Sequence, residues 1–555
     1  MTVPLRDYFL IGNLQTAALV SSDASIDWMC SPCLDSPSIF ARIIDETRGG
    51  TFGIQAEGFI SRAAYLPETA IVETIFEGKD ASFSVRDFML PRSTEEVVAH
   101  FLIRKITGIK GRASVRLIFA PRPRYARQKI MLRKKDERLL QARIGERSLW
   151  VHIPRGARMR RIKNGTSAEI VVDVIEGASL SVILEHSTES RLRFQDRDFE
   201  METMAYWREW ISKGKFPKAR RDLLVRSAIT LKLLQFFPSG GIVAAPTTSL
   251  PETLGGGRNW DYRYVWIRDA SFVLSAFSLL GYTEEALKFF RFIEEVAEGV
   301  RECEGEACDI QMSVMYSIWG QRVPREEELR HLRGYAGSHP VRIGNGAADQ
   351  VQLDIFGSLI DAYYVLWKKG MVVSKKRRDV LLLLIRKIQQ LWKSQESGIW
   401  EIRGGTFDFT YGKVMCWVGM DRAVKMAAAL GVSDEQIQQW EALRKEIHEW
   451  IWGNCFDDVR CTFRQHPGTA SQDATNFFFV LLGFLNPKDS RTAKIIEETR
   501  KELTINDVFV YRYRTADGLQ GEEGAFLLCS FWMIAALAKI GRKDEARALL
   551  QKIHG

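Results

Sequence analysis

The sequence predicts a chain of two parts, an antiparallel β-sandwich followed by an all-α toroid or bundle. At 555 residues the chain exceeds what one hydrophobic core usually serves, so two domains are expected. Up to about residue 195, short runs such as VVAHFLIRKI and EIVVDVI alternate apolar and polar residues and are broken by Gly, Pro and Asp. From about residue 205 the periodicity becomes helical, with roughly ten or more segments and no intervening strand pattern.

The boundary between the two parts is expected in the stretch METMAYWREWISKGKFPKA, which has the pattern of a linker helix. We therefore assign residues 1–200 to the β-domain, 201–220 to the linker helix and 221–555 to the helical domain. Helical runs such as DASFVLSAFSLLGY, DIFGSLIDAYYVLWKKG and FLLCSFWMIAALAKIG are joined by polar loops, and chemistry is expected on such loops at one end of the helical domain.

Composition excludes several classes of protein. Hydrophobic residues make up 46% of the chain and charged residues 26%, as in an ordinary soluble globular protein. No apolar run approaches the ~18–20 residues of a membrane span, and the N-terminus lacks the pattern of a signal peptide. Eight cysteines are too few for a disulfide framework, and the CxxC of Cys30 and Cys33 has no second pair at zinc-like spacing. We expect ordinary thiols, a cytoplasmic location and no membrane partner.

The net charge of +9 is partly concentrated in residues 122–163, where RPRYARQKIMLRKKDER and RGARMRRIK occur. Such a cluster is one feature of a nucleic-acid-binding surface. Here the basic stretches alternate with apolar runs such as SLWVHI, which is typical of the solvated faces of β-strands. We therefore expect no nucleic-acid partner.

Acidic and aromatic residues coincide outside the helix faces in three places: residues 259–269, 398–403 (GIWEIR) and 518–526 (GLQGEEGAF). Each place lies just ahead of a helical pattern. A single acidic group there is most often a helix cap or dipole partner. Three such loops that also carry aromatic rings favour a carbohydrate pocket, because rings stack on sugars while carboxylates and guanidinium groups bind hydroxyls.

Long motifs then carry a resemblance that covers nearly the whole chain. WDYRYVWIRDASF resembles the first signature of the glucoamylase family, glycoside hydrolase family 15, whose members are inverting α-glucosidases. GIWEIRGGTFDFTYGKVMCWVGMDRA and GEEGAFLLCSFW are similar to the two catalytic stretches of its prokaryotic trehalase-like branch. HLRGYAGSHPVRIGN, QVQLDIFGSLIDA and the N-terminal residues 7–44 also fit that branch. Two departures are Cys33, where arginine is common, and YSIW at 316–319, where Tyr-Gly-x-Asp is more usual.

The resemblance implies a β-supersandwich followed by an (α/α)6 barrel with a pocket at one barrel end. Arg268 and Asp269 would bind the hydroxyls at the non-reducing end of a glucosyl unit. Tyr262 and Trp266 would form the pocket wall, with glycines 255–257 turning the backbone past it. The alternative for Arg268 and Asp269 is a capping pair at a helix start.

Two carboxyl groups are expected to carry the reaction. Glu401, which follows Trp400, is the predicted general acid, because an apolar neighbour and a poorly hydrated pocket raise a carboxyl pKa. Glu523 is the predicted general base, roughly 6.5–9.5 Å from the acid as inversion requires. The adjacent Glu522 is the alternative base; Glu523 is preferred because the family motif keeps the residue directly before Gly-Ala-Phe or Gly-Thr-Phe.

The predicted function is exo-acting hydrolysis of an α-glucoside with release of glucose, with α,α-trehalase as the preferred activity. The alternatives are a glucoamylase-type 1,4-α-glucosidase, an isomaltose- or dextrin-cleaving enzyme, a phosphorylase, and a non-catalytic carbohydrate-binding version of the fold. Residues 316–319 and 331–339 are candidate loops for the leaving-group side of the pocket. No cofactor or metal is expected, and a homo-oligomer is compatible with the sequence.

Overall fold

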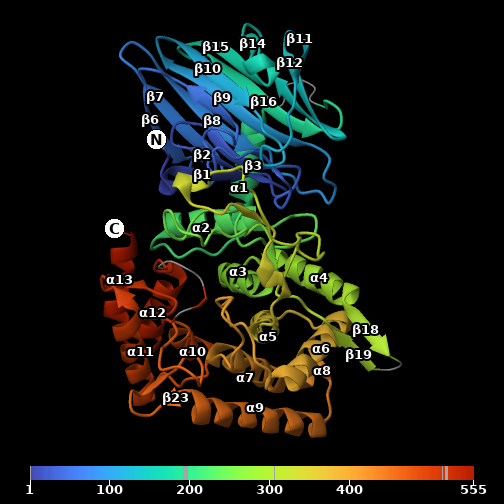
Figure 1. Cartoon of the computed structure of the whole chain (residues 1–555), viewed down its shortest axis with the longest axis vertical. Coiled ribbons are helices and arrows are strands. Elements are labelled where there is room, and N and C mark those ends of the chain that lie inside the picture. Colours follow the sequence, from blue (N-terminus) through green and yellow to red (C-terminus); the bar gives the residue numbers. More distant parts are fainter. Residues whose placement is uncertain (1, 192–197, 305–306, 516, 519–522, 555) are drawn as a thin grey trace.

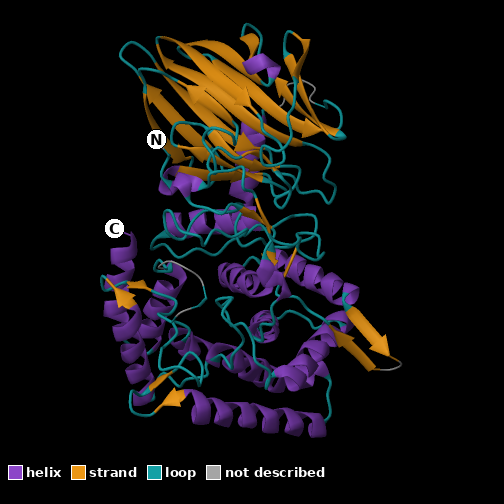
Figure 2. Ribbon diagram, in the orientation of Figure 1, coloured by secondary structure: helices purple, strands orange, loops and turns teal. Residues whose placement is uncertain are grey.

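The structure is a computed structural model that describes residues 2–191, 198–304, 307–515, 517–518 and 523–554. A sheet-rich N-terminal part precedes a helical C-terminal part, which confirms the predicted order of the two classes (Figure 1). Long strands gather at one end of the molecule and most helices at the other (Figure 2). Across the described ranges, no helix has the length and apolar character needed to cross a membrane.

The N-terminal part contains two eight-stranded antiparallel sheets. The first has the order β1-β2-β3-β5-β10-β15-β14, with β4 paired to β3; its strands are β1 Tyr8–Gly12, β2 Ala17–Ser21, β3 Ile26–Cys30, β4 Ser38–Phe40, β5 Thr51–Gln55, β10 Arg112–Ala120, β14 Arg158–Ile162 and β15 Ser167–Ile175. The second has the order β11-β12-β13-β16-β9-β8-β7-β6; its strands are β6 Ile60–Tyr65, β7 Val72–Glu77, β8 Ser82–Met89, β9 His100–Lys110, β11 Leu132–Asp136, β12 Leu139–Ile144, β13 Arg147–His152 and β16 Ser179–Ser187.

The alternating sequence pattern explains how these sheets pack. In β10, Val115 and Leu117 are buried while Arg112 and Arg116 are exposed, because successive side chains of a strand point to opposite faces. The inward residues of both sheets form one hydrophobic core. Basic residues of the 122–163 stretch lie on outward positions of β11 and β14, as the solvated-strand interpretation requires.

Helix α1, Phe199–Ser212, joins the two parts. Asp198 caps it, since its carboxylate accepts hydrogen bonds from the backbone N–H groups of residues 200 and 201. Glu200 bonds Lys105 of β9 at 2.6 Å, whereas Trp207 and Trp210 belong to the core of the helical part. The predicted linker helix at 201–220 is therefore shifted: the helix begins at Phe199 and ends at Ser212, and residues 213–220 are not helical.

The helical part packs its helices in chain order. Helix α3 contacts α5, α5 contacts α7, α7 contacts α10, and α10 contacts α12. Phe272 of α3 and Trp532 of α12 are also in ring contact at 6.0 Å, so the first and last of these helices meet. The helices are α2 Arg221–Leu234, α3 Ile267–Leu280, α4 Thr283–Gly299, α5 Asp354–Trp367, α6 Lys375–Leu391, α7 Thr410–Lys425, α8 Ala427–Leu430, α9 Asp434–Cys455, α10 Asn476–Leu482, α11 Ser490–Leu503, α12 Leu527–Lys539 and α13 Lys543–His554.

Two features of this part differ from the sequence prediction. Helix α11 was not predicted; it is capped by Asp489 and buries Ile495, Ile496 and Leu503 along one face. Although no strand pattern is visible here in the sequence, loops that meet side by side form short two-stranded ladders. These ladders pair β17 Val265–Trp266 with β20 Met315–Tyr316, β18 Arg301–Glu304 with β19 Ala307–Ile310, β21 Glu327–Glu328 with β22 Arg342–Ile343, β23 Phe456–Asp457 with β24 Thr462–Phe463, and β25 Thr504–Ile505 with β26 Phe509–Val510.

Candidate active site

One cavity of about 450 Å³ collects all three of the loops singled out in the sequence. This volume lies within the ~300–1,000 Å³ typical of small-molecule sites. All seven predicted site residues line it: Tyr262, Trp266, Arg268, Asp269, Trp400, Glu401 and Glu523. The alternative base Glu522 lies outside the described residues.

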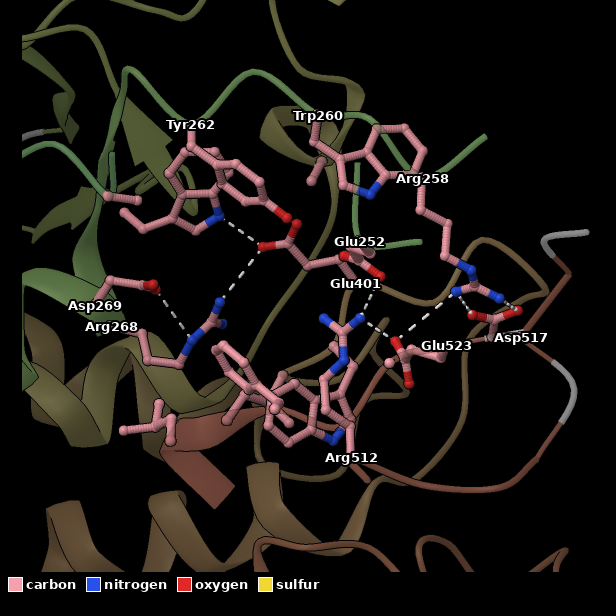
Figure 3. Close-up of a pocket in the computed structure, with 18 of the residues that line it drawn as sticks. Glu252, Arg258, Trp260, Tyr262, Arg268, Asp269, Glu401, Arg512, Asp517 and Glu523 are labelled. Atoms are coloured by element: carbon pink, nitrogen blue, oxygen red, sulfur yellow. Dashed lines mark hydrogen bonds and ion pairs between the residues drawn. The ribbon is translucent and has the colours of Figure 1, made fainter. Parts of the chain in front are cut away.

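Arg268 lies in the first turn of α3 and its guanidinium group is held on several sides. Nη1 donates to Gln352 Oε1 at 2.7 Å and lies 3.5 Å from Asp354 Oδ2, which is fully buried. Nε lies 3.4 Å from Asp269 Oδ2, and Nη2 lies 3.4 Å from Glu401 Oε1. Arg268 thus lies between Asp269 and the predicted general acid, Glu401 (Figure 3).

Asp269 is the second member of the predicted clamp. It also lies in the first turn of α3, where a carboxylate interacts favourably with the helix dipole. Its position agrees with the helix-start alternative, although the N-cap residue of α3 is Trp266 and has no side-chain capping hydrogen bond. The Asp269 side chain is nevertheless 43% exposed and lines the cavity, so the same carboxylate is available to a ligand.

Glu401 lies in the turn that follows Gly398. Its φ of +61° is in the left-handed region, which is uncommon for a residue other than glycine. Trp266 Nε1 donates to Glu401 Oε1 at 2.6 Å. Burial raises the pKa of Glu401 above its ordinary value, while Arg268 and the Trp266 hydrogen bond oppose that shift. A carboxyl with a raised pKa remains protonated to higher pH, which suits a proton donor.

Trp400 does not itself provide the polar contact to Glu401. Its indole Nε1 donates to Asp473 Oδ2 at 2.8 Å, and its ring packs against Phe526 and Trp532. The ring is thereby fixed as part of the cavity wall next to the turn that carries Glu401.

Glu523 approaches the cavity from the segment before α12 and its side chain is 10% exposed. It forms an ion pair with Arg512, and its Oε1 lies 3.8 Å from Arg258 Nη1. Its other carboxylate oxygen, Oε2, has no hydrogen-bond donor among the described residues. Burial raises the pKa of Glu523, and Arg512 opposes this by favouring the anion. On balance the pKa is raised, and Arg512 limits that shift; once ionised, the carboxylate can accept a proton from water.

Sequence reasoning missed the charged residues around Glu523. Arg512 also donates to Glu252 Oε2 at 2.7 Å, and Arg258 makes a bidentate ion pair with Asp517. Figure 3 shows these groups gathered on the Glu523 side of the cavity, opposite Arg268 and Asp269. Two features of the sequence could have pointed to these residues. One is Arg258 directly after the glycine run, and the other is the charged stretch RYRTAD (512–517) ahead of the predicted base.

The structure corrects two expectations about loops. Residues 316–319 do not line this cavity; Tyr316 and Trp319 line a neighbouring one. Residues 331–339 also stay away from the cavity, because Leu332 and Tyr335 pack against the N-terminal part. Among glycines 255–257, Gly255 has a positive φ of +77°, a conformation that favours glycine. A Cβ on residue 257 would meet no atom within 4 Å, so sterics do not require glycine there.

Cys30 and Cys33 are both buried free thiols. Burial raises their pKa values to about 11 and about 12, respectively, so both thiols are protonated near neutral pH.

The acid side of the pH–rate profile is expected to depend on Arg512. Activity appears as pH rises through the pKa of the base, so removing a cation that lowers this pKa moves the limb to higher pH. We expect Arg512→Gln to shift the acid limb of kcat/KM upward by about one pH unit. Arg403→Gln is the matched control, since Arg403 lines the same cavity but pairs with Glu326 at 2.8 Å. If the acid limb of Arg512→Gln does not move, Arg512 does not control the pKa of the base.

Comparisons with known proteins identify the family of the chain. The sequence model of the family described as "Glycosyl hydrolases family 15" matches residues 218–555, and the model described as "Trehalase-like, N-terminal" matches residues 1–202. A Mycobacterium tuberculosis protein named Trehalase is 35% identical, over 99% of this chain and 83% of that protein. Proteins named Trehalase in Thermoplasma volcanium and Trehalase 1 in Sulfolobus acidocaldarius are 31% and 29% identical, each over 98% of this chain and over 86% and 90% of their own lengths. The family model spans more than half of the chain and includes every residue that lines the cavity. The chain therefore belongs to glycosyl hydrolases family 15 and is a glycoside hydrolase.

Proposed function

We propose that the enzyme hydrolyses α,α-trehalose by a single displacement with inversion, using Glu401 as general acid and Glu523 as general base. The observation that supports this proposal is the meeting of both carboxyl groups in one cavity whose wall also carries aromatic and charged side chains. A phosphorylase needs only one carboxylate, and a binding protein has no chemical need for either. Two carboxyl groups lining one cavity therefore favour hydrolysis.

The glucosyl unit that is attacked would lie at the Arg268 end of the cavity. Arg268 and Asp269 offer a donor and an acceptor to its outer hydroxyls, while Tyr262, Trp266 and Trp400 provide apolar faces for the ring. Arg268 is already bonded to Gln352 and close to Asp354, so its guanidinium group is positioned before substrate arrives.

In the reaction, Glu401 donates its proton to the glycosidic oxygen as the bond from that oxygen to C1 breaks. Glu523 takes a proton from a water molecule whose oxygen forms the new bond to C1 from the opposite face. The reaction therefore ends with Glu401 ionised and Glu523 protonated. Proton exchange with solvent restores the starting state.

For the fold we propose a β-supersandwich in residues 1–200, a linker in 201–220 and an (α/α)6 barrel in 221–555. The contacts from α3 through α12, and the ring contact between Phe272 and Trp532, support a closed arrangement of inner helices. A cytoplasmic location, a homo-oligomer, and independence of cofactors and nucleic acids stay predictions from the sequence.

The choice of trehalose is supported by the full-length relatives named trehalase. It is tested by measuring glucose release from trehalose, maltose, isomaltose and starch, each with and without phosphate. Trehalose should give the highest kcat/KM, with no requirement for phosphate as a co-substrate. Preference for maltose or isomaltose would replace trehalase by the glucoamylase-type alternative, and glucose 1-phosphate as product would replace hydrolysis by phosphorolysis.

The anomeric form of the first product tests the single displacement. From an α-linked substrate other than trehalose, β-glucose should appear first, because water attacks the face opposite the leaving group. From trehalose the early products should be equal amounts of α- and β-glucose, since one glucose leaves with its configuration retained. Proton NMR of the anomeric signals at early times measures both. Early release of α-glucose alone would require a covalent intermediate and contradict the assignment of Glu523.

A further inference from the structure

The segment that begins at Trp260 has two faces with different partners. Residues 260–264 pair with residues 244–249 through backbone hydrogen bonds, so the segment is extended and its side chains alternate. Trp260, Tyr262 and, beyond them, Trp266 line the catalytic cavity. Asp261 and Arg263 lie on the other face and are 0% and 1% exposed. The face behind the cavity wall is therefore buried and charged.

Arg263 reaches from this face into the N-terminal part. Its Nε and Nη2 donate to Asp261 Oδ1 and Oδ2 at 2.8 and 2.6 Å, which neutralises the buried charge. Its Nη1 donates to the backbone oxygen of Ser36 at 2.8 Å and contacts Cys30 Sγ at 3.5 Å. The guanidinium carbon also lies 5.4 Å from the centre of the Tyr125 ring. One side chain thus connects the cavity wall to three elements of the sheet-rich part.

A second contact holds residues 244–249, which pair with this segment. Trp28 of β3 donates from Nε1 to the backbone oxygen of Pro246 at 2.7 Å. Around these two bonds, one hydrophobic cluster contains residues of both parts: Trp28, Cys30, Ala41, Ile43, Ile44, Tyr125, Leu329, Leu332, Tyr335 and Val341. Both paired segments, 244–249 and 260–264, are thereby bonded to the N-terminal part.

We infer that Arg263 is a positioning residue for catalysis, through which the N-terminal part fixes the cavity wall although none of its described residues lines the cavity. The link to the proposed acid is Trp266, which follows Arg263 by three positions and donates the 2.6 Å hydrogen bond to Glu401. Displacements of about 1 Å in such positioning elements cost up to about 10²-fold in rate. The inference rests on the proposed function only for the choice of substrate and the role of Glu401.

The test compares two conservative substitutions of buried arginines. Arg263→Lys keeps a positive charge beside Asp261, but an ammonium group cannot donate in a fork to Asp261 and also reach Ser36. Arg104→Lys is the matched control: Arg104 is also fully buried and binds Asp87 through two nitrogens, at 2.7 and 3.1 Å, but all of its hydrogen bonds lie within the N-terminal part. Each variant is assayed on trehalose at a temperature where it is fully folded.

We expect both variants to lower Tm, but only Arg263→Lys to lower kcat, by about ten-fold. In addition, the alkaline limb of its pH profile should move to higher pH, because a weakened Trp266 hydrogen bond no longer lowers the pKa of Glu401. A purely structural role would lower Tm without moving that limb. Equal kcat and equal limbs in Arg263→Lys and wild type would overturn the inference.

Trp28→Phe keeps the test decisive should Arg263→Lys fail to fold. It removes the donor to Pro246 while keeping an aromatic ring in the cluster, and we expect a drop in kcat of about three-fold with the same upward shift of the alkaline limb. An unchanged profile in a folded Trp28→Phe enzyme counts against the inference. Inactivity of the wild type on trehalose is a different result: it would refute the proposed substrate, and the comparison would then be made on the sugar that is turned over.

Discussion

Glu401→Gln is expected to lower kcat on trehalose by about 10²–10⁴-fold, the usual contribution of a general acid. The amide oxygen can still accept the hydrogen bond from Trp266 Nε1, and the side chain keeps its shape. What it loses is the proton for the glycosidic oxygen. Steady-state kinetics beside thermal unfolding should therefore show a large loss of kcat and a small change in Tm.

The leaving group separates a proton donor from a merely structural carboxyl. Fluoride departs from C1 without protonation, so Glu401→Gln should retain far more of the wild-type rate on α-glucosyl fluoride than on trehalose. Glu326→Gln serves as the control, because Glu326 pairs with Arg403 near the cavity but does not line it. A Glu401→Gln enzyme with more than a tenth of the wild-type kcat on trehalose would rule out this residue as the acid.

Glu523→Gln is expected to cause a loss of similar size, about 10²–10⁴-fold in kcat, on both trehalose and α-glucosyl fluoride. An amide cannot take the proton from the attacking water, and that step is needed whatever the leaving group. Arg512 keeps its 2.7 Å bond to Glu252, so the variant is not left with an unpaired buried cation and should stay folded.

The neighbouring residue provides the control for the base. Glu522→Gln should keep most of the wild-type kcat, since the base is assigned to the residue directly before Gly524. A loss larger in Glu522→Gln than in Glu523→Gln would reverse the assignment. A loss on trehalose alone, with normal hydrolysis of the fluoride, would instead make Glu523 part of the leaving-group machinery.

The sequence was most informative where unusual residues are contiguous. Trp260 to Asp269 alternate aromatic and charged side chains in a pattern that neither a helix face nor a solvated loop explains, and the structure places five of them in the cavity wall. Trp400 and Glu401 are adjacent and were found in the same way. Local composition was sufficient because each of these stretches contributes several residues to the same cavity.

Residues that act from a distance could not be identified in this way. Arg512 stands among other arginines and tyrosines, and only the tertiary fold brings it to Glu523 and Glu252. Asp354 begins a helix, where an acidic residue is ordinarily read as a dipole partner, yet it lies beside Arg268. Arg263 belongs to the signature motif, but the strand alternation that turns it away from the cavity shows only in the structure.

The left-handed backbone at Glu401 places stability and the proposed catalytic role in conflict at this position. A residue with a Cβ held at φ +61° costs of order 1 kcal/mol or more relative to a relaxed conformation, and glycine would relieve that cost. Selection for thermal stability alone would therefore favour glycine here, at the cost of the proposed proton donor. A search for stabilising substitutions in this enzyme should hold residue 401 fixed and look elsewhere.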